Sequence, residues 1–198
     1  MSAFSTAAAQ AIKDDQFPVT ESPRSEVKSF MTVDYAIRLF EKEDIDTVIE
    51  INQLTLPENY PSSFFMGLHS HAPKAFLVAV IDSKVIGYIM CRIERGISSF
   101  RKPYPVKRGH IVSVAVLRDY RRHGIGTQLV KKAMKAMEHY GASEFFLEVR
   151  KSNTPAVSAY EKMGFEVTRV LRGYYRDGED AYLMAKQESD AKDEDSNV

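Results

Sequence analysis

The feature that most constrains this chain is an apolar strand that runs directly into a glycine-containing turn and a helix. Residues 110–117 are apolar and rich in valine, which predicts a strand covered on both faces. Residues 118–124 follow as a turn, and apolar residues at helical spacing predict an amphipathic helix over 126–140. Because a helix N-terminus carries unpaired N–H groups and partial positive charge, this junction favours phosphate binding.

The composition of this turn allows two interpretations. Gly124 and Gly126 would let a diphosphate approach the backbone, and Arg121, Arg122 and His123 add local positive charge. The same residues would also suit an ordinary strand-to-helix turn with a solvated basic corner. The turn lacks the Gly-Lys-Ser/Thr ending of a Walker loop and the third glycine of a dinucleotide fingerprint, so it indicates neither of those sites.

The sequence around this junction predicts one globular domain between two tails. Residues 1–31 show no sustained periodicity and are expected to be disordered or loosely attached. Residues 187–198 are acidic and polar and are expected to form a second tail. Residues 32–186 remain as the domain, and this length suffices for a sizeable core without disulfides.

The domain shows an alternation of strand and helix patterns in the order β-α-α-β-β-β-α-β-α-β-β. Strands are expected at 33–39, 76–81, 85–93, 110–117, 145–149, 165–171 and 180–184, and helices at 43–53, 62–70, 126–140 and 154–163. Ser62 or Ser63 is expected to cap the second helix, and the proline-containing stretch 95–108 to form a loop. Early hairpins followed by βαβ crossovers predict an α/β domain (an α+β mixed sheet) with helices on both faces.

Charge and cysteine content exclude several classes of protein. The chain has 27 basic and 27 acidic residues, so it lacks a global basic field, and no dedicated nucleic-acid site is expected. The basic side chains Arg101, Lys102, Lys107 and Arg108 are interpreted as a solvated loop, with ribosomal RNA as the alternative contact. The chain has no apolar run of membrane-spanning length, no secretory signal and a single cysteine, which predicts a cytoplasmic protein.

Two motifs in sequence order resemble the GNAT acetyltransferase superfamily. Arg121, Gly124 and Gly126 occupy the defined positions of its acetyl-CoA signature, Arg/Gln-x-x-Gly-x-Gly/Ala. Downstream, Asn153 precedes a helix that contains Tyr160 within Tyr-Glu-Lys, and Gly-Phe follows that helix, as in the second half of the family. This resemblance extends over residues 33–186. It implies acetyl-CoA as cosubstrate and the GNAT fold, a central, mostly antiparallel sheet with a splayed parallel pair.

Within that superfamily, the chain is most similar to protein N-terminal acetyltransferases, namely the archaeal type and the catalytic subunit of the NatA type. The similarity lies in Leu-Pro-Glu-Asn-Tyr-Pro at 56–61 and in Gly-Tyr-Tyr-x-Asp-Gly-Glu-Asp-Ala-Tyr at 173–182. It implies direct acetyl transfer in a ternary complex to the N-termini of proteins, including nascent chains at the ribosome, with broad first-residue specificity. Two alternatives are acetylation of lysine or a small-molecule amine, and CoA binding without turnover.

The resemblance also implies roles for individual residues. Cofactor contacts are expected from Val114, Ala115, Val116, Arg121, Arg122, His123, Gly124, Ile125, Gly126, Thr127, Asn153 and Tyr160. Substrate contacts are expected from Glu58, Tyr60, Tyr174 and Tyr175. Tyr160 would give a proton to the departing thiolate, and the alternative is an aromatic side chain that only packs on the core.

Acetyl transfer needs a neutral amine, which indicates what base the site requires. A free α-amine has a pKa of about 7.7–8.0, so roughly a tenth of α-amines are neutral at pH 7. The neutral fraction of lysine side chains, with a pKa of about 10.4, is far smaller. A modest base acting through water therefore suffices. We expect His110 and Glu148 to share this deprotonation if they face the same side of the sheet.

Three alternatives remain open for these and neighbouring groups. His110 could instead be satisfied by backbone groups, and Glu148, among apolar neighbours, needs a partner. Two such ligands are too few for a committed zinc site, so no metal is expected. Cys91 is interpreted as a buried strand thiol, with a covalent acetyl-cysteine intermediate as the alternative.

Overall fold

The computed structural model describes residues 33–101 and 103–188 and confirms the predicted order of strands and helices. The strands are β1 Ala36–Leu39, β2 Leu77–Ile81, β3 Lys84–Ile97, β4 Pro105–Val116, β5 Glu144–Arg150, β6 Glu166–Leu171 and β7 Ala181–Gln187. The helices are α1 Ile45–Thr55, α2 Ser62–His71, α3 Ile125–Glu138 and α4 Thr154–Lys162. The short 3-10 helices η1 Lys42–Asp44, η2 Pro73–Ala75 and η3 Arg118–Tyr120 add to this order.

The expected tails fall almost entirely outside the described residues. Residues 1–31 and 189–198 are not described, so the predictions made for them stay predictions. At the C-terminal boundary Gln187, expected to begin the tail, is instead the last residue of β7.

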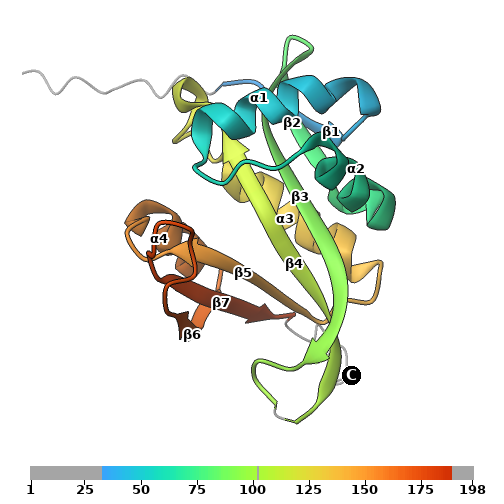
Figure 1. Cartoon of the computed structure of the whole chain (residues 1–198). Coiled ribbons are helices and arrows are strands. Elements are labelled where there is room, and N and C mark those ends of the chain that lie inside the picture. Colours follow the sequence, from blue (N-terminus) through green and yellow to red (C-terminus); the bar gives the residue numbers. More distant parts are fainter. Residues whose placement is uncertain (1–32, 102, 189–198) are drawn as a thin grey trace, which may run out of the picture. The chain divides into compact units, whose positions relative to one another are not determined.

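The sheet has seven strands in the order β1-β2-β3-β4-β5-β7-β6. Every neighbouring pair is antiparallel except β4 and β5, which run parallel. That pair is joined only from Arg108↔Glu144 to His110↔Phe146. Beyond this point both strands continue and diverge, as the ribbon shows (Figure 1). This opening confirms the splayed parallel pair expected from the resemblance.

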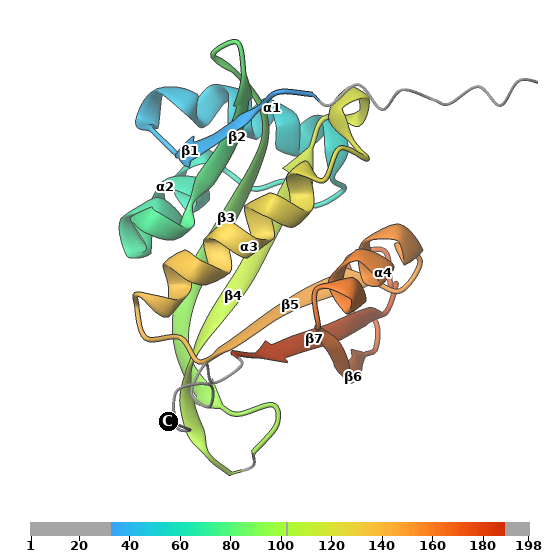
Figure 2. The same ribbon diagram turned by 180° about the vertical axis from the view of Figure 1, so that it is seen from behind.

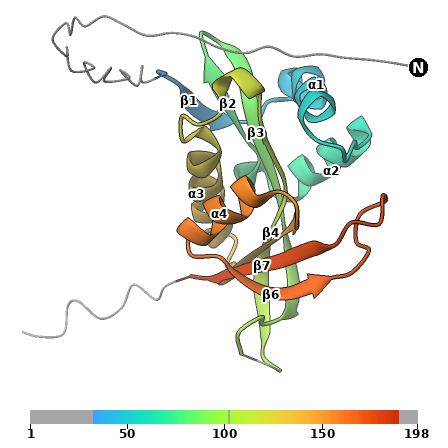
Figure 3. The same ribbon diagram turned by 90° about the vertical axis from the view of Figure 1, so that its left-hand side faces the viewer.

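Helices cover both faces of the sheet, as predicted. α1 and α2 lie on one face, and α3 and α4 lie on the other (Figures 2 and 3). The α3 face holds a core cluster in which the helix buries Ile125, Leu129, Val130, Ala133, Met134 and Met137. The opposite cluster joins side chains of α1 and α2 to β2 and β3. Each fully buried large apolar side chain contributes about 1.5–3 kcal/mol, so these faces dominate the packing.

The β3–β4 hairpin is longer than predicted. Residues 95–108 were expected to be a loop, but β3 extends to Ile97 and β4 begins at Pro105, in continuous register. Pro105 is tolerated because it is the first residue of its strand. The connecting turn is anchored from inside: the buried carboxylate of Glu144 accepts hydrogen bonds from the Ser98 hydroxyl and from the Ser99 N–H, the latter at 2.9 Å.

The basic side chains of this hairpin are also less free than expected. Arg108 donates to the Ile97 carbonyl at 3.2 Å and lies over the ring of Phe146, 3.9 Å from its centroid. Lys107 donates to the Tyr140 carbonyl at 2.8 Å. The prediction of a solvated basic loop is therefore wrong in its structure, because both residues lie in β4, and Lys107 is still exposed to solvent. Lys102 lies outside the described residues.

The serine cap predicted for α2 is wrong, whereas α4 has a side-chain cap that was not predicted. The N-cap of α2 is Pro61, which has extended backbone angles, and neither Ser62 nor Ser63 caps the helix because both lie in its first turn. The N-cap of α4 is Asn153, whose side chain accepts from the Ala156 N–H at 3.3 Å. Gly164, with φ of +86°, ends that helix as expected.

Candidate active site

The junction of β4 with α3 forms an open, electropositive turn. Gly124 is the N-cap of α3 with φ of +77°, and no heavy atom would lie within 4 Å of a Cβ added there. No side chain caps this helix, so the N–H groups of its first turn are available to a ligand. Arg122 also has positive φ, and Arg121 folds back so that its Nε donates to the Val116 carbonyl at 2.9 Å. Space, free donors and positive charge fit a diphosphate.

A cavity of about 470 Å³, called the turn cavity below, runs along this junction. The predicted cofactor residues other than His123 line it, namely Val114, Ala115, Val116, Arg121, Arg122, Gly124, Ile125, Gly126, Thr127, Asn153 and Tyr160. The backbone of β4 forms one wall because β5 has already diverged. An extended ligand arm can therefore lie beside β4 where a strand would otherwise pair.

Basic side chains that the sequence analysis did not assign surround a second cavity next to this one. It measures about 660 Å³, is called the lysine cavity, and shares Arg122 and Thr127 with the turn cavity. Lys131 of α3 and Lys162 of α4 line it together with the Ser158 hydroxyl. Lys162 belongs to the Tyr-Glu-Lys motif, and this motif could have indicated from the sequence that Lys162 lines a cavity.

A third cavity of about 590 Å³, called the loop cavity, lies between the α1–α2 loop and the β6–β7 loop. The predicted substrate residues Glu58, Tyr60, Tyr174 and Tyr175 all line it, and so does Glu148. It shares six residues with the turn cavity, namely Thr55, Leu56, Val114, Asn153, Ala156 and Tyr160. The two cavities therefore meet at α4, beside the open end of the splayed strands.

His110 and Glu148 come together, as the sequence analysis required. His110 Nε2 lies 2.7 Å from Glu148 Oε2, and both side chains are largely buried, at 9% and 16% exposure. The imidazole stacks on Phe146 with a centroid distance of 4.3 Å, because β4 and β5 pair at these two residues. Arg92 Nε donates to His110 Nδ1 at 3.0 Å, so both ring nitrogens have side-chain partners. Only Glu148 of the pair lines the loop cavity.

Tyr160 lies where the turn and loop cavities meet, with its ring packed edge-on against Phe165. Tyr160 therefore packs on the core and also lines both cavities, and its expected role as a proton donor stays a prediction. Burial, followed by the neighbouring thiol of Cys91, raises the pKa of Tyr160 to about 12. The phenol is thus protonated at neutral pH and able to donate a proton.

The three tyrosines that line the loop cavity are also held in their protonated form. Burial, followed by the carboxylates of Glu58 and Glu148, raises the pKa of Tyr60. Burial and then Glu148 raise the pKa of Tyr174, and burial and then Glu58 raise that of Tyr175. Their phenols can therefore donate hydrogen bonds while their rings cover apolar groups.

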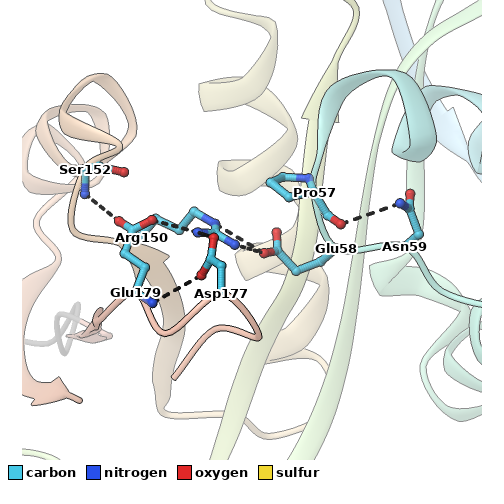
Figure 4. Close-up of polar contacts among 7 residues, drawn as sticks. All are labelled: Pro57, Glu58, Asn59, Arg150, Ser152, Asp177 and Glu179. Carbon is cyan, nitrogen blue, oxygen red and sulfur yellow. Dashed lines mark hydrogen bonds and ion pairs between the residues drawn. The ribbon is translucent and has the colours of Figure 1, made fainter. Parts of the chain in front are cut away.

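Arg150 joins the two loops that bound the loop cavity (Figure 4). Its Nε and NH2 atoms donate to Glu58 Oε1 at 3.2 and 2.6 Å, and its NH1 atom donates to Asp177 Oδ2 at 2.8 Å and Glu179 Oε2 at 2.6 Å. The guanidinium also lies 4.0 Å from the ring centroid of Tyr175. We call these four charged residues the Arg150 clamp. Glu58, expected to meet the substrate, has Arg150 as its partner.

Charges near Arg150 are stabilised by further hydrogen bonds. The Glu179 N–H, followed by Arg150, lowers the pKa of Asp177. The Ser152 N–H, followed by Arg150, lowers the pKa of Glu179. No role was expected for Arg150 from the sequence.

A buried polar group supports the floor of the loop cavity and was also missed. Asn52 of α1 donates to the Tyr88 hydroxyl at 3.0 Å, and that hydroxyl lies 2.8 Å from Ser113 Oγ on β4. Ser113 lines the cavity. This network ties α1 to the strand that forms the cavity wall.

Cys91 lies in the core, away from the three cavities. Cys91 is fully buried, burial raises the pKa of its thiol, and it lines none of the three cavities. This supports the buried-thiol interpretation over an acyl-cysteine.

Within residues 33–101 and 103–188, no group of three or more His, Cys, Asp or Glu side chains is arranged to hold a metal ion. No helix in this described part is long and apolar enough to span a membrane.

Comparison with known proteins agrees with this geometry. The sequence matches the Acetyltransferase (GNAT) family over residues 34–165. It is 52% identical over 155 residues to an N-alpha-acetyltransferase of Saccharolobus solfataricus, covering 77% of this chain and 93% of that protein. It is 35% identical over 153 residues to the N-terminal acetyltransferase A complex catalytic subunit NAA10 of Arabidopsis thaliana, covering 76% of each.

A solved structure gives the same result at the level of the fold. The crystal structure of Ard1 from Thermoplasma volcanium superposes with a TM-score of 0.68 at 30% identity, covering 77% of this chain and 97% of that one. Together with the signature turn, the splayed sheet and the adjoining cavities, these matches show that the chain belongs to the GNAT acetyltransferase family.

Proposed function

We propose that this protein transfers the acetyl group of acetyl-CoA to the N-terminal α-amine of proteins by direct attack in a ternary complex. The observation that carries the proposal is the meeting of two cavities at Tyr160, one beside a helix N-terminus and one between two tyrosine-bearing loops. The similarity to proteins named N-alpha-acetyltransferase supports the same acceptor.

The residues of the turn cavity fit acetyl-CoA, which supplies the activated acetyl group. The first turn of α3 offers backbone N–H groups to the pyrophosphate, and the open space at Gly124 admits it. β4 offers main-chain groups to the pantetheine arm where it no longer pairs with β5. Lys131 and Lys162 extend the positive charge into the lysine cavity, so we propose that they hold a phosphate at the nucleotide end of the ligand.

The residues of the loop cavity fit an extended peptide that begins with a free amine. Tyr60, Tyr174 and Tyr175 would donate hydrogen bonds to its backbone, and Glu148 lines the same cavity. The His110–Glu148 pair takes up the proton that the amine loses. Tyr160 gives a proton to the sulfur of the leaving group. The loop cavity of about 590 Å³ supports broad first-residue specificity.

The test compares peptides that differ only in their acceptor groups. Peptides beginning with Ser, Ala, Thr or Met-Leu, with free N-termini and no lysine, are incubated with acetyl-CoA and analysed by mass spectrometry. Matched peptides have a blocked N-terminus and one internal lysine. We expect acetylation of the free N-termini at least about 100-fold faster, because roughly a tenth of α-amines but very few lysines are neutral at pH 7.

Two variants accompany this assay. Glu148→Gln should lower kcat about 100-fold, the range of a positioned base, and Glu166→Gln on the exposed strand β6 should leave it unchanged. Acetylation confined to the blocked, lysine-containing peptides would refute the N-terminal acceptor. CoA binding with no turnover on any amine would refute the enzymatic proposal altogether.

We also propose that the protein acts in the cytoplasm, on nascent or completed chains. The single cysteine, buried as a free thiol, supports a reducing compartment. Co-sedimentation of the protein with translating ribosomes, compared with run-off ribosomes, tests the contact with nascent chains.

A further inference from the structure

The hydrogen bond from Arg92 determines where His110 carries its proton. Arg92 on β3 lies opposite His110 on β4 in the antiparallel register. Its Nε lies 3.0 Å from His110 Nδ1 and can only donate, because arginine keeps all its protons at any relevant pH. Nδ1 must therefore be the unprotonated nitrogen. The ring proton is then on Nε2 and points at Glu148 Oε2, 2.7 Å away.

Arg92 is itself held in place by a row of charges on the same face. Its NH2 atom lies 3.3 Å from Glu94 Oε2, and Arg108 NH2 lies 3.4 Å from Glu94 Oε1. Arg108 covers one side of the Phe146 ring, which stacks on the imidazole. The imidazole thus has fixed neighbours at both nitrogens and on its face, which leaves little freedom for the ring to turn.

We propose that Arg92 is a positioning residue that keeps His110 as the neutral Nε2–H tautomer, so that Glu148 rather than His110 accepts the proton of the substrate amine. This inference rests on the proposed function. In the reaction, the amine nitrogen bonds to the acetyl carbon and the carbon–sulfur bond breaks. The nitrogen loses one proton to Glu148, directly or through water, and the sulfur gains one from Tyr160. Exchange of one proton from Glu148 to Tyr160 through water restores both groups.

This arrangement assigns different tasks to the two members of the pair. Glu148 lines the loop cavity and is the group that substrate can reach, whereas His110 lies behind it. His110 donates to the carboxylate and orients it, and it keeps its own proton throughout. Without the Arg92 donor, Nδ1 would become free to bind a proton. The resulting imidazolium would pair with Glu148 and make that carboxylate a weaker base.

The charged and titratable groups around His110 and its partner carboxylate, with that carboxylate included, come from five parts of the fold. They are Arg92 and Glu94 on β3, Arg108 on β4, Glu148 on β5, Tyr60 in the α1–α2 loop and Tyr174 in the β6–β7 loop. Tyr60 and Tyr174 stay protonated because their pKa values are raised, so they do not titrate with the pair. A change in pH dependence caused by Arg92 should therefore report on His110 and Glu148.

The experiment measures kcat and KM from pH 5.5 to 9.5 for wild type, Arg92→Leu and Arg92→Lys, with a free-N-terminal peptide. We expect Arg92→Leu to move the acid limb of kcat upward by about one pH unit, a loss of about tenfold below that limb. KM for both substrates should change less than about twofold, because Arg92 lines none of the three cavities. Arg92→Lys, which keeps a cationic donor, should restore most of the wild-type profile.

A matched control and an independent measurement complete the test. Arg95→Leu removes a guanidinium from the same strand at an exposed position and should leave the profile unchanged. Nitrogen-15 NMR of the imidazole, assigned with His110→Ala, should show protonated Nε2 and bare Nδ1 in the wild type. An Arg92→Leu profile identical to wild type, or a wild-type imidazole protonated at Nδ1, would overturn the proposal. The NMR measurement needs no turnover, so it separates this failure from failure of the proposed function.

Discussion

At the scale of single residues, the proposed site combines phenols that stay protonated with the carboxylate of Glu148, which lines the loop cavity. Tyr160 has its pKa raised to about 12, chiefly by burial, and so is protonated and able to donate a proton at neutral pH. Glu148 has the imidazole of His110 as its hydrogen-bond partner at 2.7 Å. The acid and the base of the proposed reaction are thus different groups on different elements, α4 and β5.

Tyr160→Phe tests the proton-donating role at this scale. The ring and its packing on Phe165 remain, so stability should change by less than about 1 kcal/mol, whereas loss of the phenol should lower kcat about 100-fold. Because a raised pKa keeps the phenol protonated, wild-type kcat should show no alkaline decline from Tyr160 below about pH 10, two units under the Tyr160 pKa of about 12. Stopped-flow turnover and thermal melting measure both effects. A wild-type kcat in the Tyr160→Phe enzyme would show that Tyr160 packs on the core and does not donate a proton in the reaction.

At the scale of elements, the α1–α2 loop and the β6–β7 loop, which bound the loop cavity, are connected through the last residue of β5. Arg150 ends that strand and holds Glu58 from one loop and Asp177 and Glu179 from the other. The planar guanidinium satisfies acceptors on several sides at once, which an ammonium group does not. We therefore expect Arg150 to help set the spacing of the loops and the width of the loop cavity.

Arg150→Lys is therefore expected to loosen the mouth of the loop cavity while the charge is kept. KM for the peptide should rise about tenfold, from the loss of one or two charge-assisted hydrogen bonds, and KM for acetyl-CoA should stay within about twofold. Lys151→Gln, next in sequence but directed to Asp180 at 3.5 Å, is the matched control. Steady-state kinetics with each substrate varied distinguishes these cases. An unchanged peptide KM in Arg150→Lys would show that the loops keep their spacing without the Arg150 clamp.

At the scale of the domain, the proposed function depends on the incomplete pairing of β4 with β5. β4 and β5 pair only from Arg108 to His110 on one side and Glu144 to Phe146 on the other, and then separate. The residues that line the turn and loop cavities all lie between Thr55 and Arg176. Residues 33–188 therefore contain the complete proposed site.

Removal of residues 1–31 tests this at the same scale. A chain that begins at Thr32 should keep kcat and both KM values within about twofold of the full chain, because no residue of the proposed site is removed. Activity assays and circular dichroism on both chains provide the comparison. Loss of turnover in a shortened chain that still has the far-ultraviolet spectrum of the full chain would assign the N-terminal residues a part in the reaction.

The sequence by itself determined the order of the elements and the position of the phosphate turn. Both are local properties: periodicity over ten or so residues distinguishes strand from helix, and Gly124 permits the left-handed turn that begins α3. The errors had local causes too. A loop was predicted at 95–108 from Gly96, Pro103 and Pro105, but the register of the β3–β4 hairpin continues there. A cap was predicted at Ser62 or Ser63, but the N-cap residue of α2 is Pro61.

Only the tertiary structure decided how the residues of the proposed site are paired, since the predicted cooperation of His110 with Glu148 depended on which face of the sheet each occupies. Arg92 and His110 are 18 residues apart in sequence, His110 and Glu148 are 38 apart, and Glu58 and Arg150 are 92 apart. Sequence periodicity shows which face a side chain occupies, and it contains no information on which strands become neighbours or in what register. The register of β3, β4 and β5 is set by packing of the whole sheet between its helices, and that packing places Arg92 on the imidazole and Arg150 between the two loops.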